Sequence, residues 1–95
     1  GTDCKYSDSG YIILGALIES VIHQPYEIFI LENCLRPLGM HSTYYDHNRS
    51  LIPKRAIGYE KNARGEKFHA NYIDMSFPHA AGALASSVED LYTLD

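Results

Sequence analysis

The sequence predicts a mixed α+β fold in which helices dominate and a short β-hairpin is the main extended element. Two apolar segments with helical start and stop signals lie in the first half of the sequence, and a third helical pattern lies near its end. Between them, two short β-prone runs flank a polar turn. With 95 residues, 45% hydrophobic and 21% charged, the chain has the length and balance of one small globular unit.

The first helix is expected over residues 9–23. This segment is apolar on nearly all sides, and Ser7, Asp8 or Ser9 can cap its start by accepting a hydrogen bond from a free backbone N–H. An apolar surface all round predicts a buried helix. Gly15 in its middle is less favourable than Ala by about 1 kcal/mol, so we expect it to let another backbone approach closely.

A second helix is expected from Tyr26 to near Arg36. Pro25 stops the first helix and suits the first turn of the next, while Pro37 and Gly39 provide the termination. The apolar residues that follow helical spacing are Tyr26, Phe29, Ile30 and Cys34.

The rest of the chain alternates extended and polar segments. Residues 43–45 favour extended backbone, and residues 46–50 form a polar loop. Residues 56–60 predict a short strand, and residues 62–65 predict the turn into residues 67–69, which together make a small hairpin.

The last part of the chain predicts a loop followed by a helix. Residues 78–84 are mostly small and predict a loop. Ser86 or Ser87 is expected to cap a helix over residues 88–92, with Glu89 and Asp90 favourably near its positive end.

Composition excludes several classes of partner. The formal net charge of −4 provides no basic surface for phosphates, which argues against nucleic acid and against a helix-turn-helix reader. The longest apolar stretch, residues 11–18, is interrupted by Gly15 and is far shorter than the ~20 residues of a membrane span. Cys4 and Cys34 suggest no disulfide framework, and we expect two free thiols.

Motifs of one known family occur along the chain in a fixed order. They are Gly1-Thr2 with Tyr6-Ser7-Asp8-Ser9-Gly10-Tyr11 and Ile13-Leu14-Gly15; Gln24-Pro25-Tyr26 with Phe29, then Arg36-Pro37-Leu38-Gly39-Met40 and Ser42-Thr43; Gly58-Tyr59; and Ala81-Gly82-Ala83-Leu84-Ala85-Ser86-Ser87-Val88-Glu89-Asp90-Leu91. Together they resemble the serine β-lactamase and penicillin-binding-protein family, which includes class C β-lactamases, D-Ala-D-Ala carboxypeptidases and esterases. The resemblance implies that residues 1–95 are the central helix-rich lobe of a β-lactamase/transpeptidase-like domain.

The resemblance also implies a catalytic role for Tyr6. In the family a Ser attacks a carbonyl to form an acyl-enzyme, a Lys one helical turn later assists, and a Tyr shuttles the proton; Tyr6 matches that Tyr. A phenol with an ordinary pKa near 10 becomes a usable base only when nearby cations favour its anion. The family's Lys would supply one, whereas the adjacent Lys5 is expected to point to the surface.

Four further residues are expected to contact substrate: Asp8, Ser7, His79 and Gly82. Asp8 stands where the family most often has Asn, and a carboxylate only accepts hydrogen bonds. We therefore expect esters or peptides to be better substrates than β-lactams. Ser7 also suits a helix cap worth about 1 kcal/mol. His79 lies in the loop that should face the cleft, and Gly82 should shape its wall because small residues let a ligand approach.

Two elements of the family's machinery are absent from these 95 residues: Ser-x-x-Lys, and the late Lys-Thr-Gly or His-x-Gly strand. We expect the first upstream and the second downstream in a longer protein, since the sequence begins Gly1-Thr2-Asp3 without Met or a signal-peptide pattern. This polypeptide alone is then expected to hydrolyse nothing. The resemblance favours a bacterial protein outside the cytoplasm or anchored to the membrane.

Two functions remain open. The first is part of a serine hydrolase acting on a small molecule or peptide. The second is a non-catalytic module of a degenerate relative that binds peptide, muropeptide or a partner protein; a Ser-x-x-Lys upstream of Gly1 separates them.

The residue pattern argues against a metal site and favours self-association. No metal and no cofactor are predicted, because the five histidines form no i, i+4 pair and have no Cys at ligand spacing. An apolar face freed from the rest of the domain predicts a homodimer or swapped oligomer.

Overall fold

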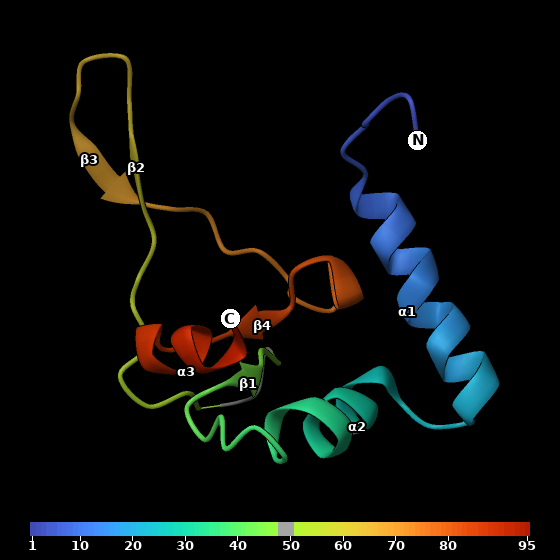
Figure 1. The fold of residues 1–95 in the computed structure, drawn as a ribbon. Helices are drawn as coiled ribbons and strands as arrows, with labels where there is room; N and C mark the ends of the chain where they lie inside the picture. The colour runs from blue at the N-terminus through green and yellow to red at the C-terminus, as the bar shows by residue number, and fades with distance from the viewer. Residues whose placement is uncertain (48–50) are drawn as a thin grey trace.

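The computed structural model describes residues 1–47 and 51–95 (Figure 1). In chain order the elements are α1 (Asp8–Ile22), α2 (Tyr26–Ile30), the π-helical turn η1 (Leu31–Leu35), β1 (Tyr44–Tyr45), β2 (Tyr59–Lys61), β3 (Lys67–His69), the 3-10 turn η2 (His79–Ala81), β4 (Leu84–Ala85) and α3 (Val88–Leu94). The predicted α+β, mostly helical fold with a small hairpin is confirmed. The polar loop predicted over residues 46–50 lies partly outside the described residues, at positions 48–50.

Helix α1 has the ends that the sequence predicts. The Ser7 side chain caps its start by accepting from the Gly10 backbone N–H at 3.1 Å. His23 caps its end in the left-handed region, with φ 56°, and its N–H donates to the Glu19 carbonyl at 2.9 Å.

The prediction that α1 is buried on all sides is wrong for this chain, since Gly15 is its one buried residue. The principal contacts of α1 are with η2 and α2. An apolar surface indicates that a helix packs against other elements, but it does not say which ones. In this chain η2 and α2 cover only a small part of the α1 surface. The large apolar side chains left more than half exposed on α1 are Tyr11, Ile13, Leu14, Leu17 and Val21.

The second helix begins at Tyr26 and extends to Leu35, close to the predicted end at Arg36. Its last turn is π-helical, because the Arg36 N–H donates to the Leu31 carbonyl at 3.0 Å. Gly39 follows with φ 70°, a conformation that favours glycine.

The hairpin β2–β3 is confirmed, although its first strand begins at Tyr59 and not at residue 56. Tyr59 pairs with His69 and Lys61 with Lys67 in an antiparallel register. The turn is held by Asn62, whose side-chain oxygen accepts from the Arg64 and Glu66 backbone N–H groups at 2.9 and 3.0 Å.

The loop prediction over residues 78–84 is wrong in part. Residues His79–Ala81 form the 3-10 turn η2, and Leu84 pairs with Tyr45 where β4 lies antiparallel to β1. The small side chains suggested irregular structure, but a strand partner distant in sequence leaves no local signal.

Helix α3 is anchored to the residues just before β1 through a buried carboxylate. Asp90 accepts from the Ser42 N–H at 2.8 Å and from the Thr43 hydroxyl at 2.7 Å. Ser87 caps the helix and accepts from the Asp90 N–H at 3.2 Å, which identifies the cap among the two predicted serines.

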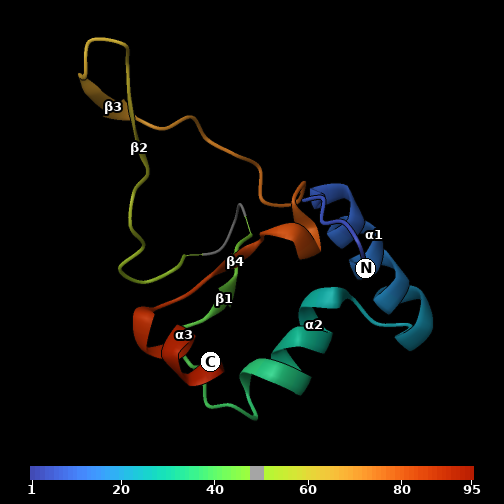
Figure 2. The ribbon, with the colours of Figure 1, turned by 45° about the horizontal axis from the view of Figure 1, so that its top comes forward.

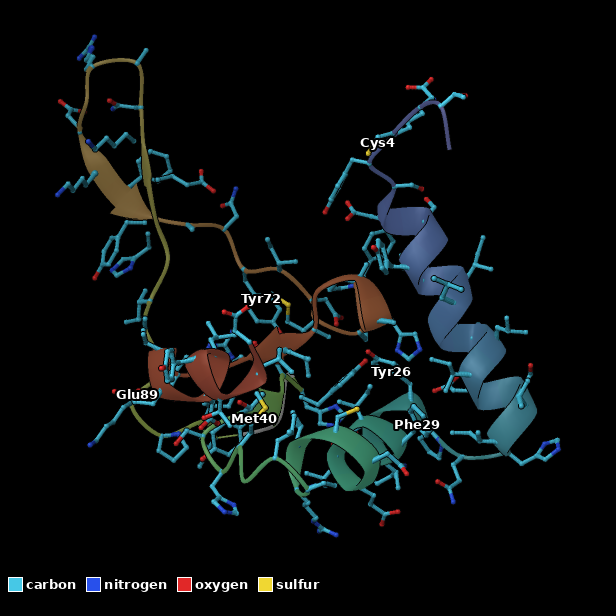
Figure 3. All side chains as sticks on the ribbon, viewed as in Figure 1. Cys4, Tyr26, Phe29, Met40, Tyr72 and Glu89 are labelled. Atoms are coloured by element: carbon cyan, nitrogen blue, oxygen red, sulfur yellow. The ribbon has the colours of Figure 1, made fainter. Side chains whose placement is uncertain are left out.

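The core is small. Figure 3 shows Tyr26 and Met40 within the central body, whereas Cys4 lies on the extended segment leading into α1. Cys4 and Cys34 are free thiols, as predicted. Among residues 1–47 and 51–95, the buried hydrophobic residues are Tyr26, Leu35, Met40 and Ala83.

The described chain is open. Its radius of gyration is 15.8 Å, whereas a compact domain of this length has about 12 Å. Figures 1 and 2 both show α1 on one side, the β2–β3 hairpin on the other, and the remaining elements between them. Within residues 1–47 and 51–95, no helix combines the length and the apolar character needed to cross a bilayer.

Candidate active site

Tyr6 lies on the extended segment just before α1 with an open face. Its side chain is 82% exposed, so the phenol is not sealed in an apolar core. The hydroxyl donates to the Asp8 Oδ1 at 2.7 Å. The two residues are thus paired at the start of the helix.

This pairing acts on the charge state of Tyr6. The hydrogen bond to Asp8, the negative charge of Asp8, and to a smaller extent desolvation and Tyr11 raise the pKa of Tyr6 above its ordinary value near 10. In this arrangement the phenol is a proton donor. A general-base role requires a cation close enough to reverse the shift.

Ser7 and Asp8 both have roles in the helix itself. Ser7 has extended backbone, with φ −152°, and its side chain caps α1. Asp8 is the first residue of α1, where a negative charge favours the helix dipole. Structural roles are therefore present at both positions.

His79 has both ring nitrogens directed at protein groups. Its Nδ1 lies 2.9 Å from the Tyr45 hydroxyl, and its Nε2 lies 3.7 Å from the Glu19 Oε1. The ring also packs edge-on against Tyr26, with centroids 5.1 Å apart. His79 is half-buried and joins α1, α2 and β1.

Tyr45 keeps its hydroxyl proton where it meets His79. Desolvation, followed by the charges of Glu27 and Glu19 and by Tyr26, raises the pKa of Tyr45. The phenol therefore stays protonated, and either the phenol or the imidazole can donate in the hydrogen bond between them.

Gly82 ends the turn η2 with φ 172°, an extended backbone that any residue adopts. A Cβ added there would meet the Pro78 Cβ at 3.7 Å, an ordinary contact. Among the described residues, neither conformation nor packing requires glycine at this position.

The candidate residues form two groups beside α1. Tyr6, Ser7 and Asp8 lie at the start of α1, while the turn that carries His79 and Gly82 packs against α1 at Gly15. Gly15 follows Asp8 by seven residues, which corresponds to about 10 Å of helix rise.

Sequence reasoning missed the residues that hold His79. Tyr45 comes from β1, Tyr26 from α2 and Glu19 from α1, and no local pattern connects three elements. One signal was available: Gly15 and Glu19 are four residues apart and share a helix face.

In the part of the chain that the structure describes, the candidate residues line neither the cavity beside α2 nor a metal site. A cavity of about 190 Å³ lies beside α2 and β1, and none of the five candidate residues lines it. In the described ranges, no group of three or more His, Cys, Asp or Glu side chains could hold a metal ion.

The sequence profile of the Beta-lactamase family matches residues 1–95. PbpX of Bacillus subtilis (strain 168), a penicillin-binding-protein-like relative, is 33% identical over 91 residues, which are 95% of this chain and 23% of that protein.

Solved structures agree with this match. The fold is similar to a D-stereospecific amidohydrolase from Streptomyces sp., with a TM-score of 0.83 and 26% identity over 99% of this chain and 28% of that one. It is also similar to an octameric penicillin-binding protein homologue from Pyrococcus abyssi, with a TM-score of 0.76 and 32% identity over 98% of this chain and 21% of that one.

The chain thus spans between a fifth and a third of the length of these relatives. The family match extends from the Tyr6 segment through the α3 helix, and the fold of the chain is similar to that of the solved relatives. The chain therefore belongs to the Beta-lactamase family.

Proposed function

We propose that this chain is the tyrosine-bearing part of a longer serine hydrolase that forms an acyl-enzyme with an amide, ester or β-lactam. The observation that carries the proposal is the exposed Tyr6 phenol at the start of α1, in the Tyr-Ser-Asp segment of a family member. An exposed hydroxyl can exchange a proton with groups that the rest of the protein supplies.

In the proposed mechanism Tyr6 carries the proton between nucleophile and leaving group. With the Tyr6 phenol first ionised, the serine hydroxyl attacks the carbonyl and its proton passes to the phenolate oxygen. The bond to the leaving group then breaks, and the same proton passes to the departing amine or alkoxide. A lysine near the phenol would lower the pKa of Tyr6 and oppose the effect of Asp8.

Asp8 favours esters and peptides over β-lactams as substrates. Its carboxylate already accepts from Tyr6 and cannot donate to a substrate carbonyl as an amide would. Asp8→Asn is expected to raise kcat/KM for a cephalosporin relative to that for a p-nitrophenyl ester. Rapid cephalosporin turnover by the unmodified protein would contradict this assignment.

The remaining candidates are assigned auxiliary roles. Ser7 holds the start of α1 and offers its hydroxyl to substrate, Gly82 shapes the wall of the cleft, and His79 lies beside that wall. The 95-residue chain alone is proposed to be inactive, because its sequence contains no Ser-x-x-Lys.

A non-catalytic binding function is the second candidate. It is favoured by the effect of Asp8, since a phenol whose pKa is raised stays protonated and is not available as a base. Its oxygen can still accept a hydrogen bond from an N–H of a peptide or muropeptide while its O–H donates to Asp8. A degenerate relative would retain such a binding surface without its nucleophile.

One experiment separates the two functions. The full-length protein that contains these residues is incubated with a fluorescent penicillin and with a p-nitrophenyl ester, and adducts are located by mass spectrometry. The hydrolase predicts a covalent adduct on a serine outside this chain and a Tyr6→Phe variant with turnover reduced by about 10² to 10⁴.

The matched control is Tyr92→Phe, which removes a phenol of similar exposure, 85%, from α3. Its turnover should stay within about twofold of the wild type, as is usual for surface changes. Reversible binding without any adduct would instead support the binding module.

A further inference from the structure

The contact between α1 and the turn η2 depends on the absence of a side chain at Gly15. A Cβ built there would lie 2.6 Å from the Ala80 Cβ and 2.9 Å from the His79 Cδ2. Real Cβ atoms do not approach so closely, so any other residue at position 15 pushes the turn away from the helix.

The same turn is held from its other side by the His79 side chain. Its ring reaches Tyr45 on β1 and Glu19 on α1, four residues beyond Gly15. On one face of α1, Gly15 therefore packs against His79 and Ala80, and Glu19 lies near the His79 ring. Tyr45 connects His79 to β1.

The backbone of His79 is strained, with φ 42° in the left-handed region. A residue without glycine's freedom persists there only when its surroundings enforce the conformation. The conformation has a use, because the His79 carbonyl accepts from the Gly82 and Ala83 N–H groups at 3.4 and 3.1 Å. Ala83 is 1% exposed, and its carbonyl accepts from Asp46 N at 2.7 Å.

We infer that Gly15 and His79 are positioning residues, which fix the turn His79–Ala81 against α1 and thereby hold the Gly82 segment at a set separation from Tyr6. The inference rests on the proposed function, since it assigns these two residues to the alignment of the cleft wall with the proton carrier. It also gives His79 a role other than direct substrate contact, as both its nitrogens already face protein groups.

The first test changes the packing at Gly15 in the full-length protein. Gly15→Ala should lower kcat for the ester by at least about tenfold, because a displacement of about 1 Å can reduce rates a hundredfold. The variant is assayed well below its melting temperature, so a loss of stability alone does not reduce kcat.

Two matched variants accompany it. Gly10→Ala adds the same methyl group to the same helix, where the nearest neighbour would be Ser7 Oγ at an ordinary 3.5 Å, and kcat should stay within about twofold. Gly15→Ala with Ala80→Gly removes the closest clash and should recover part of the lost kcat, since the His79 ring still lies within 3 Å of the added methyl group.

The second test changes His79 and remains decisive if Gly15→Ala does not fold. Asn tolerates positive φ and keeps a polar atom near the place of Nδ1, so His79→Asn should retain more kcat than His79→Ala. His23→Asn and His23→Ala are the matched pair, since His23 also has positive φ, 56°, but lies outside the turn. Both should leave kcat nearly unchanged.

Three outcomes are distinguished by including Tyr6→Phe. Loss of kcat in Tyr6→Phe, Gly15→Ala and His79→Ala, with rescue by Ala80→Gly, supports the inference. Loss in Tyr6→Phe while folded Gly15→Ala or His79→Ala keeps wild-type kcat overturns the inference alone. Wild-type kcat in Tyr6→Phe overturns the proposed function and the inference with it.

Discussion

At the residue scale, the pair Tyr6 and Asp8 sets the chemistry of the candidate site. The phenol donates to a carboxylate at 2.7 Å and is otherwise open to solvent. The motif identified Tyr6 and marked Asp8 as a departure from the usual Asn, but it could not reveal their hydrogen bond. Between the two residues, the cap residue Ser7 has extended backbone.

Replacing Asp8 by Asn should lower the pKa of Tyr6. The substitution removes the negative charge and weakens the acceptor, the two largest causes of the upward shift. The phenol titration is followed by NMR of ¹³C-labelled tyrosine, with Tyr6→Phe identifying the signal. Asp3→Asn, which changes a carboxylate of the same segment, is the control; an unchanged Tyr6 titration in Asp8→Asn would contradict the assignment.

The sign of the pH dependence follows from this shift. Because the folded-state pKa is raised, the Tyr6 to Asp8 bond is fully present below the ordinary phenol pKa near 10. Its contribution to stability is lost as pH rises through the raised value. The Tyr6→Phe variant should therefore lose less stability than the wild type over that alkaline range in urea unfolding.

At the element scale, capping and one buried carboxylate hold the helices in place. Ser7 caps α1, Ser87 caps α3, and Asp90 joins α3 to the residues before β1. These are side-chain contacts with backbone groups that would otherwise lack a partner.

Ser7→Ala should destabilise the chain by about 1 kcal/mol, because the Gly10 N–H loses its partner. Urea unfolding followed by circular dichroism measures the change. Ser9→Ala, inside the first turn of the same helix, is the control and should be neutral or slightly stabilising, since Ala is the better helix former. Equal stability of Ser7→Ala and wild type would argue against the cap.

Asp90→Ala should have a larger effect, about 2 kcal/mol or more, because the Ser42 N–H and the Thr43 hydroxyl both lose their acceptor. The neighbouring Glu89→Ala is the control on the same helix turn. A melting temperature equal to that of wild type would contradict the anchoring role.

Local signals predicted the elements but not their partners. The apolar run, Pro25 and the pair Pro37 and Gly39 delimit the first two helices, and Asn62 marks the hairpin turn. By contrast, the pairing of Leu84 with Tyr45 and the bond from Tyr45 to His79 connect distant residues, the latter 34 positions apart. Such contacts are selected by three-dimensional packing and leave no periodic trace.

At the scale of the whole molecule, the chain has an open shape, and apolar side chains of helix α1 are exposed. Its radius of gyration of 15.8 Å and the exposed apolar side chains on α1 agree with the expectation that a free piece of this domain exposes an apolar face. The chain spans about a quarter of the length of these family relatives.

The isolated chain should self-associate through α1. Light scattering of the 95-residue polypeptide is expected to give a dimer or larger species at high concentration. Leu17→Glu should shift it toward monomer, whereas Val88→Glu, an exposed site on α3, should not. A monomer at all concentrations would contradict this prediction.

The most direct test of the central claim is the rate of acyl-enzyme formation by the full-length protein in a single turnover with a chromogenic ester. If Tyr6 carries the proton, acylation in Tyr6→Phe should slow by about 10² to 10⁴ while Tyr92→Phe acylates at nearly the wild-type rate. Acylation of Tyr6→Phe at the wild-type rate would contradict the account.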